Sequence, residues 1–140
     1  MTLVIDAAPI VALAESDEPR RQATLDVMRA EPGGLIIPSP VTAEIDYLLG
    51  QRFGRTAGGA FLRDLAAGRF IVSCPDPEDY TKIADLDARY ADLDLGLADC
   101  ALVVIADRYE TNRVVTFDER HFRAVTPIAG GSFTILPADN

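Results

Sequence analysis

The chain of 140 residues contains no tryptophan, two cysteines and a single histidine. Cys74 and Cys100 lack the close spacing of a zinc-ligand pair, so we expect both to be reduced, buried small residues. No apolar run approaches the roughly 20 residues that a membrane helix needs. The amino terminus lacks the basic flank and cleavage site of a signal peptide, so the expected compartment is the cytoplasm, with no membrane partner.

Positive charge is also scarce, because 13 basic residues face 22 acidic ones and the net charge is -9. This balance makes a passive electrostatic hold on nucleic acid improbable. The charge is uneven: eight acids face two basic residues between Asp76 and Asp99, and four arginines face one acid between Gln51 and Phe70. The asymmetry fits a cation site beside a rim that meets an anion, but it equally fits solvated helix faces.

The hydrophobic content is 49% and the mean hydropathy is +0.12, which excludes a disordered chain. The length suits a single domain over residues 1–140 with a sizeable core. Short apolar runs alternate with helical patterns, and this alternation predicts an α/β fold with a mostly parallel central sheet of 4–5 strands. The expected strands cover residues 3–5, 35–37, 70–72, 114–118 and 133–136. The apolar segment at 98–109 is long enough to be a buried helix, although its β-branched residues alone favour a strand.

Four acids are expected at the same edge of this predicted sheet. Asp6 follows the first strand, and Asp118 ends the fourth. Glu44 lies about one turn into the helix after the second strand, and Asp99 lies at the head of the apolar helix. The carboxyl edge of a parallel sheet is where open α/β folds bind their ligands. Asp6 taken alone is equally well explained as the cap of the following helix.

Converging carboxylates repel one another and raise each other's pKa values, and a divalent cation removes that penalty. Hard oxygen ligands without a cluster of histidine or cysteine favour Mg²⁺ or Mn²⁺ over zinc. Such an ion activates water and neutralises charge on a phosphoryl group. The pattern therefore predicts a metal site suited to phosphodiester hydrolysis.

Four short motifs carry a family resemblance: VIDA at residues 4–7, TAEI at 42–45, LADC at 97–100 and TFDERHF at 116–122. In order and approximate spacing they resemble the PIN-domain nucleases, and most of all the VapC-type toxins of prokaryotic toxin–antitoxin pairs. The resemblance spans nearly the whole chain. It implies a PIN-like three-layer α/β/α fold.

The same resemblance implies roles for individual residues. Asp6 and Asp99 would be the principal metal ligands, and Glu44 and Asp118 would complete the acidic pocket. Thr116 would be a polar group that contacts these acids without binding the metal itself. The implied activity is cleavage of RNA with Mg²⁺ or Mn²⁺. The implied partners are an RNA substrate, a second copy of the chain in a homodimer, and a small cognate antitoxin that blocks the pocket.

Other interpretations stay open. Asp94 is either a fifth acid or, preferably, a helix cap. His121 fits a turn-packing or rim role better than a general base. A haloacid-dehalogenase-like phosphatase also begins with a strand and an aspartate, but Ala8 stands where that class usually has a second aspartate. A catalytically inactive PIN-like binding module is the remaining alternative.

Overall fold

The computed structural model describes residues 2–140. Its strands are β1 (Leu3–Ile5), β2 (Leu35–Pro38), β3 (Ile71–Ser73), β4 (Arg113–Val115) and β5 (Thr134–Leu136). Its α-helices are α1 (Ala7–Ala12), α2 (Arg21–Ala30), α3 (Ser39–Phe53), α4 (Arg55–Ala66), α5 (Pro77–Arg89), α6 (Gly96–Arg108) and α7 (Glu119–Ala124). A 3₁₀ turn at Ala91–Leu93 joins α5 to α6.

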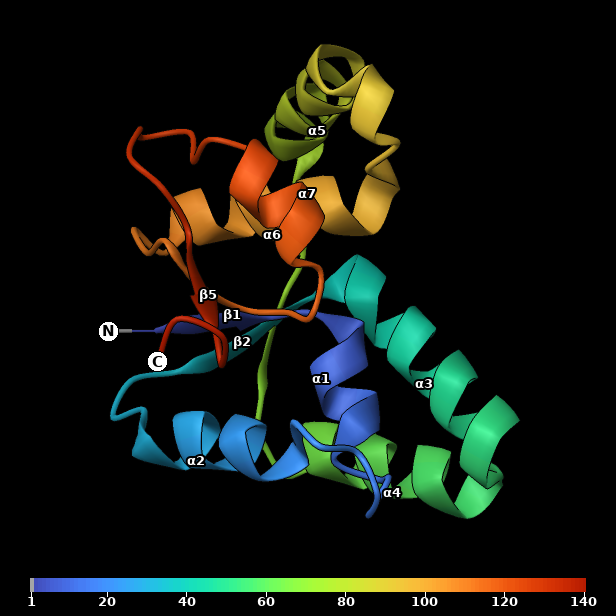
Figure 1. Ribbon diagram of the computed structural model, residues 1–140. Coiled ribbons are helices and arrows are strands. Elements are labelled where there is room, and N and C mark those ends of the chain that lie inside the picture. Colours follow the sequence, from blue (N-terminus) through green and yellow to red (C-terminus); the bar gives the residue numbers. More distant parts are fainter. Residues whose placement is uncertain (1) are drawn as a thin grey trace.

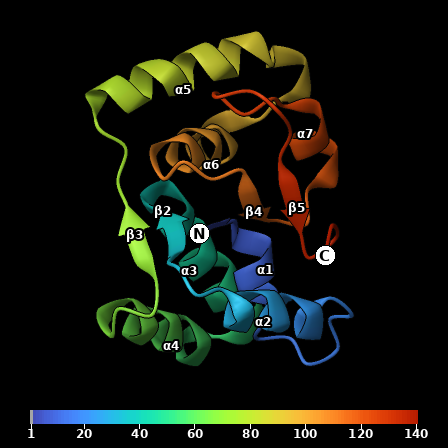
Figure 2. The same cartoon turned by 90° about the vertical axis from the view of Figure 1, so that its left-hand side faces the viewer.

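The strands form one sheet in the order β3-β2-β1-β4-β5, and every neighbouring pair is parallel. Helices α1 to α4 lie on one side of the sheet, and α5 to α7 lie on the other (Figures 1 and 2). This confirms the three-layer α/β/α prediction, with a sheet that is entirely parallel rather than mostly so. None of the helices in residues 2–140 combines the length and the apolar character needed to span a bilayer.

The strand order reverses at β1, and this reversal places the site. From β1 the chain moves outward through β2 to β3, and it then returns to add β4 on the other side of β1. The ladder continues past both strands, because the Asp6 N–H donates to the Val115 carbonyl (2.9 Å). Connections that leave β1 and β4 toward opposite faces open a crevice at the carboxyl ends of these strands.

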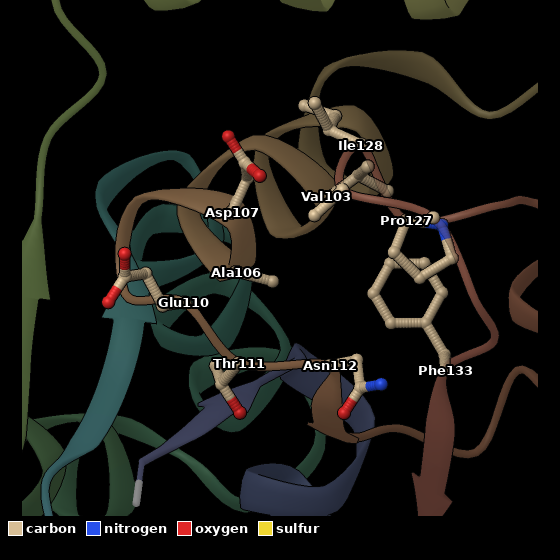
Figure 3. Close-up of a pocket in the computed structure, with 11 residues that line it drawn as sticks. Val103, Ala106, Asp107, Glu110, Thr111, Asn112, Pro127, Ile128 and Phe133 are labelled. Atoms are coloured by element: carbon tan, nitrogen blue, oxygen red, sulfur yellow. The ribbon is translucent and has the colours of Figure 1, made fainter.

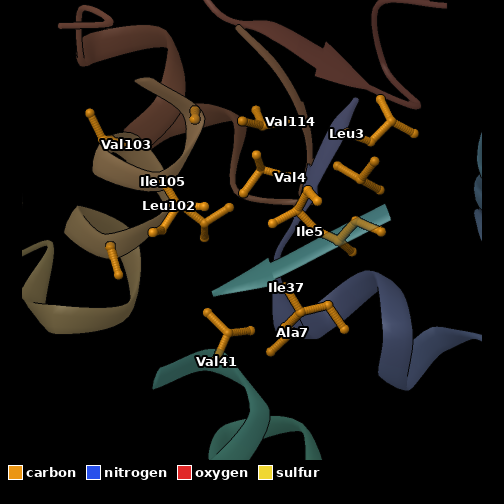
Figure 4. Close-up of a cluster of buried hydrophobic side chains, with 14 of the residues drawn as sticks. Leu3, Val4, Ile5, Ala7, Ile37, Val41, Leu102, Val103, Ile105 and Val114 are labelled. Atoms are coloured by element: carbon orange, nitrogen blue, oxygen red, sulfur yellow. The ribbon is translucent and has the colours of Figure 1, made fainter. Parts of the chain in front are cut away.

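Helix α6 and strand β1 form the centre of the core (Figure 4). All three residues of β1 are fully buried, and the seven residues at positions 100–106 of α6 are each at most 1% exposed. Burying a large aliphatic side chain contributes about 1.5–3 kcal/mol. Val103, Val104 and Ile105 are helical despite their strand propensity, because α6 packs against both the sheet and α5 and is covered on nearly all sides.

Two buried acids are tied to arginines and connect distant segments. The Glu31 side chain after α2 is 2% exposed and accepts a hydrogen bond from Arg113 Nη1 at the start of β4 (2.7 Å). Asp79 on α5 pairs with Arg108 at the end of α6. Arg108 also donates to the Ser73 hydroxyl (2.7 Å), so it joins both helices to β3. These contacts hold the outer layers in register with the sheet.

The cysteine prediction is half right. Both cysteines are free, and Cys100 is buried in α6, but Cys74 is exposed. Cys74 directly follows the edge strand β3, whose Ile71 and Val72 side chains are also exposed. An edge strand has no neighbour on one side, so the chain that leaves it stays in contact with solvent.

Candidate active site

Asp6 follows β1 and caps α1, so the capping interpretation of this residue is confirmed. Its Oδ1 accepts a hydrogen bond from the Ala7 N–H (2.8 Å). Its Oδ2 accepts a hydrogen bond from the Thr116 hydroxyl (2.8 Å). Each oxygen keeps a lone pair for a further partner.

Thr116 connects the two loops that leave the switch point. Its side chain is buried. Its hydroxyl group donates a hydrogen bond to Asp6, and the hydroxyl oxygen accepts one from the Asp118 N–H (3.0 Å). Asp118 was expected to end a strand, but β4 ends at Val115 and Asp118 instead caps α7. The difference arises because Thr116 already turns its side chain toward β1 and the following residues start the helix.

Asp99 and Asp118 meet at His121. The Nδ1 atom of His121 lies 2.8 Å from Oδ2 of Asp118 and 3.3 Å from Oδ2 of Asp99. Ligand atoms of these three residues all lie within 4.8 Å of one another. Asp99 lies in the first turn of α6, which begins at Gly96, so Asp99 is the fourth helical residue. The first turn of a helix favours an anion there.

The short helix α7 is fixed at both ends. At its start, Asp118 Oδ1 accepts a hydrogen bond from the His121 N–H (3.1 Å), which leaves Oδ2 for the pocket. Further along, the Phe122 ring packs edge-on against Phe133 with centroids 5.6 Å apart. Arg123 donates to Asp139 (3.0 Å) near the end of the chain.

Glu44 and Asp94 lie outside this cluster. Glu44 is exposed on α3, and partial burial of its carboxyl together with the charge of Asp6 raises its pKa. Glu44 is therefore near enough to Asp6 to be affected by its charge, and we call the exposed side of the acidic pocket where it lies the rim. Asp94 follows the 3₁₀ turn with a positive φ of 54°, and it is exposed. Asp94 is the C-terminal cap of the 3₁₀ turn and does not cap α6, whose preceding residue is Leu95, so its interpretation as a helix cap holds for the 3₁₀ turn alone.

The acids influence one another's ionisation. Burial raises the pKa of Asp6, hydrogen bonds from Ala7 and Thr116 oppose that change, and the charge of Asp118 adds to it. Burial first, and then the charge of Asp6, raises the pKa of Asp99 to about 6, although His121 acts in the opposite direction. Three of the four predicted acids thus share one electrostatic environment, and the fourth reaches it through Asp6.

Asp99 should make the stability of the metal-free protein depend on pH. An acid whose pKa is higher in the folded state keeps its proton there after the unfolded chain has lost it. Its contribution to the free energy of unfolding is therefore full below about pH 4, and it is lost as the pH rises through the folded pKa near 6. The loss is at most about 3 kcal/mol. Urea denaturation in EDTA between pH 4 and 7 should show this decline in the parent and a flatter profile in Asp99→Asn. If the parent and Asp99→Asn show the same dependence of stability on pH, a raised pKa of Asp99 is contradicted.

The donor set fits a divalent cation. Three carboxylates lie close enough to perturb one another, and the cluster of Asp99, Asp118 and His121 offers donor atoms at the spacing of a metal site. Acids with raised pKa values are unfavourable together until a cation neutralises them. Asp6, Asp99, Asp118 and His121 are thus the residues that could hold the ion, with Glu44 at the rim.

A separate cavity of about 510 Å³ lies away from these acids (Figure 3). Its lining includes Asn112, just before β4, and Phe133, just before β5, so it opens at the amino ends of these strands. The acids lie at the opposite, carboxyl ends. This cavity therefore takes no part in the candidate site.

His121 is the site residue that the sequence interpretation left outside the pocket. A usable signal was present, because Asp118 and His121 are three residues apart across a helix start. In that arrangement the third helical residue lies beside the cap. Recognising it required knowing that Asp118 begins a helix rather than ends a strand.

Solved structures share this fold. The crystal structure of VapC20 from Mycobacterium tuberculosis, described as a Sarcin-Ricin loop cleaving toxin, matches with a TM-score of 0.76 at 15% identity, over 84% of this chain and 90% of that one. VapBC2 from Rickettsia felis, bound to a DNA fragment from its promoter, matches with a TM-score of 0.67 at 14% identity, over 96% and 97%. Together with the acidic pocket at the switch point, these matches define a PIN-like α/β/α domain.

A sequence relative makes the assignment narrower. Ribonuclease VapC26 of Mycobacterium tuberculosis is 36% identical over 135 residues, which cover 96% of this chain and all of the relative. No family model matches the chain. An identity of this level over nearly the full length shows that the chain belongs to the VapC family of PIN-domain toxins, as the four motifs predicted.

Proposed function

We propose that this protein is a metal-dependent endoribonuclease, the toxin of a type II toxin–antitoxin system, acting in the cytoplasm. The observation that carries the proposal is the convergence of Asp6, Asp99 and Asp118 at the switch point of the sheet. Membership of the VapC family, with a relative named a ribonuclease, supports the same activity. The haloacid-dehalogenase-like alternative has no comparable support.

The chain's own residues would hold a Mg²⁺ or Mn²⁺ ion and orient the reaction. When bound, the ion supplies a Lewis acid that polarises a phosphoryl oxygen and lowers the pKa of water. The Thr116 hydroxyl and the Ala7 N–H each fix one oxygen of Asp6, so this carboxylate needs no rearrangement on binding. Glu44 is exposed at the rim, and its raised pKa makes it a better proton acceptor than an ordinary carboxylate.

An RNA substrate requires that this acidic protein bind a polyanion. A bound cation would offset part of the pocket's negative charge. Of the four arginines between residues 51 and 70, Arg55 pairs with Asp46 and Arg69 with Asp64, so the arginine-rich segment is already partly neutralised. We therefore place recognition on the pocket rim rather than on a broad basic face.

The proposed protein partners follow from family and charge. A net charge of -9 and an acidic pocket favour a basic segment of a cognate antitoxin. A protein of the same fold from Klebsiella pneumoniae forms a toxin–antitoxin complex. A homodimer of the toxin is proposed on the family resemblance alone.

An RNA cleavage assay tests the proposal. We expect the purified protein to cleave RNA internally with Mg²⁺ or Mn²⁺, to lose cleavage in excess EDTA, and to regain it when the ion is restored. Sequencing of RNA ends would locate the cut. Cleavage that persists in EDTA would contradict metal dependence. Binding of RNA or antitoxin without cleavage under any of these ions would favour the inactive binding module.

A further inference from the structure

His121 lies inside the acidic pocket. Its side chain is 19% exposed, comparable to the 17% of Asp99 and well below the 38% of Asp118. Its Nδ1 atom, rather than a ring carbon, faces both carboxylates. A histidine that merely packed the turn would not need to aim a nitrogen at two acids.

The distances around Nδ1 match those between neighbouring ligands of one small cation. Ligand atoms about 2.1 Å from an octahedral ion and at right angles to each other lie roughly 3 Å apart. The structure has 2.8 Å from Nδ1 to Asp118 Oδ2 and 3.3 Å from Nδ1 to Asp99 Oδ2. Nδ1 therefore lies at the spacing of a neighbouring ligand from each of the two carboxylates, and ligand atoms of all three residues lie within 4.8 Å of one another.

We propose that His121 Nδ1 is a direct ligand of the divalent cation, together with Asp99 and Asp118, and that it makes the site prefer Mn²⁺ over Mg²⁺. The inference rests on the proposed metal dependence and adds a nitrogen donor to it. Imidazole binds transition metals better than Mg²⁺, which favours oxygen donors alone. The pocket would thus discriminate between two ions that an all-carboxylate site treats more alike.

The local structure holds His121 in place for this role. The backbone N–H of His121 donates a hydrogen bond to Asp118 Oδ1. Asp118 therefore both caps α7 and fixes the backbone of His121. The next residue, Phe122, is buried, which prevents rotation of α7. A donor that is positioned in advance binds an ion with little loss of conformational freedom.

The same contacts have a competing explanation, in which His121 acts as an internal cation that neutralises the two acids. The two explanations predict opposite effects of removing the side chain. If His121 is a ligand, its loss weakens metal binding. If His121 is a substitute cation, the metal competes with it, and its loss strengthens metal binding.

The experiment compares metal binding by the full chain and its variants at one pH. Calorimetric titrations with MnCl₂ and MgCl₂ are made on the parent, on His121→Ala and on His121→Gln, and pulsed EPR of the Mn²⁺-loaded proteins detects a directly bound nitrogen. Asp94→Asn is the matched control, because Asp94 is exposed and outside the cluster. Thermal melts in EDTA verify that each variant is folded.

We expect a nitrogen coupling in the parent and in Asp94→Asn, and none in either His121 variant. Mn²⁺ affinity should fall at least 10-fold in both variants, with a smaller loss for Mg²⁺. Unchanged or stronger Mn²⁺ binding, or a parent spectrum without a nitrogen coupling, would overturn the inference. A parent that binds neither ion would instead contradict the proposed metal dependence, whereas a parent that binds Mn²⁺ no more tightly than the two His121 variants would leave that dependence standing without His121.

Discussion

Asp6→Asn is expected to lower the rate of RNA cleavage by about 1000-fold or more, while the folded protein becomes more stable. Asp6 is the acid on the central strand β1, and it perturbs the ionisation of both Asp99 and Glu44. Under the proposed mechanism, removing its charge takes away one of the proposed metal ligands and so the metal-assisted stabilisation of the transition state. A 1000-fold loss corresponds to about 4 kcal/mol.

The gain in stability has a separate cause. Burial disfavours the charged form of Asp6, as its raised pKa shows, and asparagine of the same shape carries no charge. Its side-chain carbonyl can still accept from the Ala7 N–H, so α1 keeps its cap. We therefore expect a higher midpoint of thermal unfolding in EDTA. Opposite changes in rate and stability are typical of residues retained for function.

Single-turnover cleavage and thermal melts on the same preparations would measure both effects. Asp94→Asn removes the same charge at an exposed position where φ is 54°, a conformation that asparagine tolerates. This control should change neither quantity appreciably. Cleavage by Asp6→Asn within 10-fold of the parent would remove Asp6 from the proposed catalytic set.

Arg113→Met is expected to lower the free energy of unfolding by about 3 kcal/mol. Arg113 Nη1 donates to Glu31, whose side chain is 2% exposed. Removing the arginine from a buried ion pair takes away a charged partner of the remaining acid, and this costs more than the pair itself contributes. The pair also connects the end of α2 to the start of β4, so its loss loosens α2 against the sheet.

Urea denaturation at pH 7 would measure the change. Arg69→Met is the matched control, because Arg69 pairs with Asp64 at the surface and such exposed pairs contribute about 0–1 kcal/mol. The double variant Glu31→Leu/Arg113→Met should recover part of the stability, since it removes both charges together. A loss below 1 kcal/mol in Arg113→Met would show that Glu31 is adequately compensated without this arginine.

Much of the fold was predictable from local patterns. Short apolar runs ended by breakers identified all five strands to within a few residues, and their alternation with helices predicted the parallel sheet. The three-layer arrangement was implied by the family resemblance. These patterns work because a strand buried on both faces must be apolar throughout. The apolar segment that became α6 was predicted as a helix from its length, against the preference of its β-branched residues.

Local exposure was predictable only in part. Cys100 lies in the apolar helix α6, which is covered on nearly all sides. Its burial was predictable because the residues around it in the sequence are almost all apolar. Cys74 looks much the same in sequence but follows an edge strand, and only the strand order reveals that β3 is the edge. Whether a short apolar strand is covered on one side or on both depends on contacts far away in the chain.

The sequence by itself determined that Asp6, Glu44, Asp99 and Asp118 lie toward one edge of the sheet, because chain direction in a parallel sheet fixes where each strand ends. Only the tertiary structure decided how they are grouped. It keeps Glu44 at the rim, excludes Asp94, and adds His121 between Asp99 and Asp118. The physical reason is that one ion is bound only when each donor atom lies within about an ångström of its required position. Those positions depend on how α6 and α7 pack across the switch point.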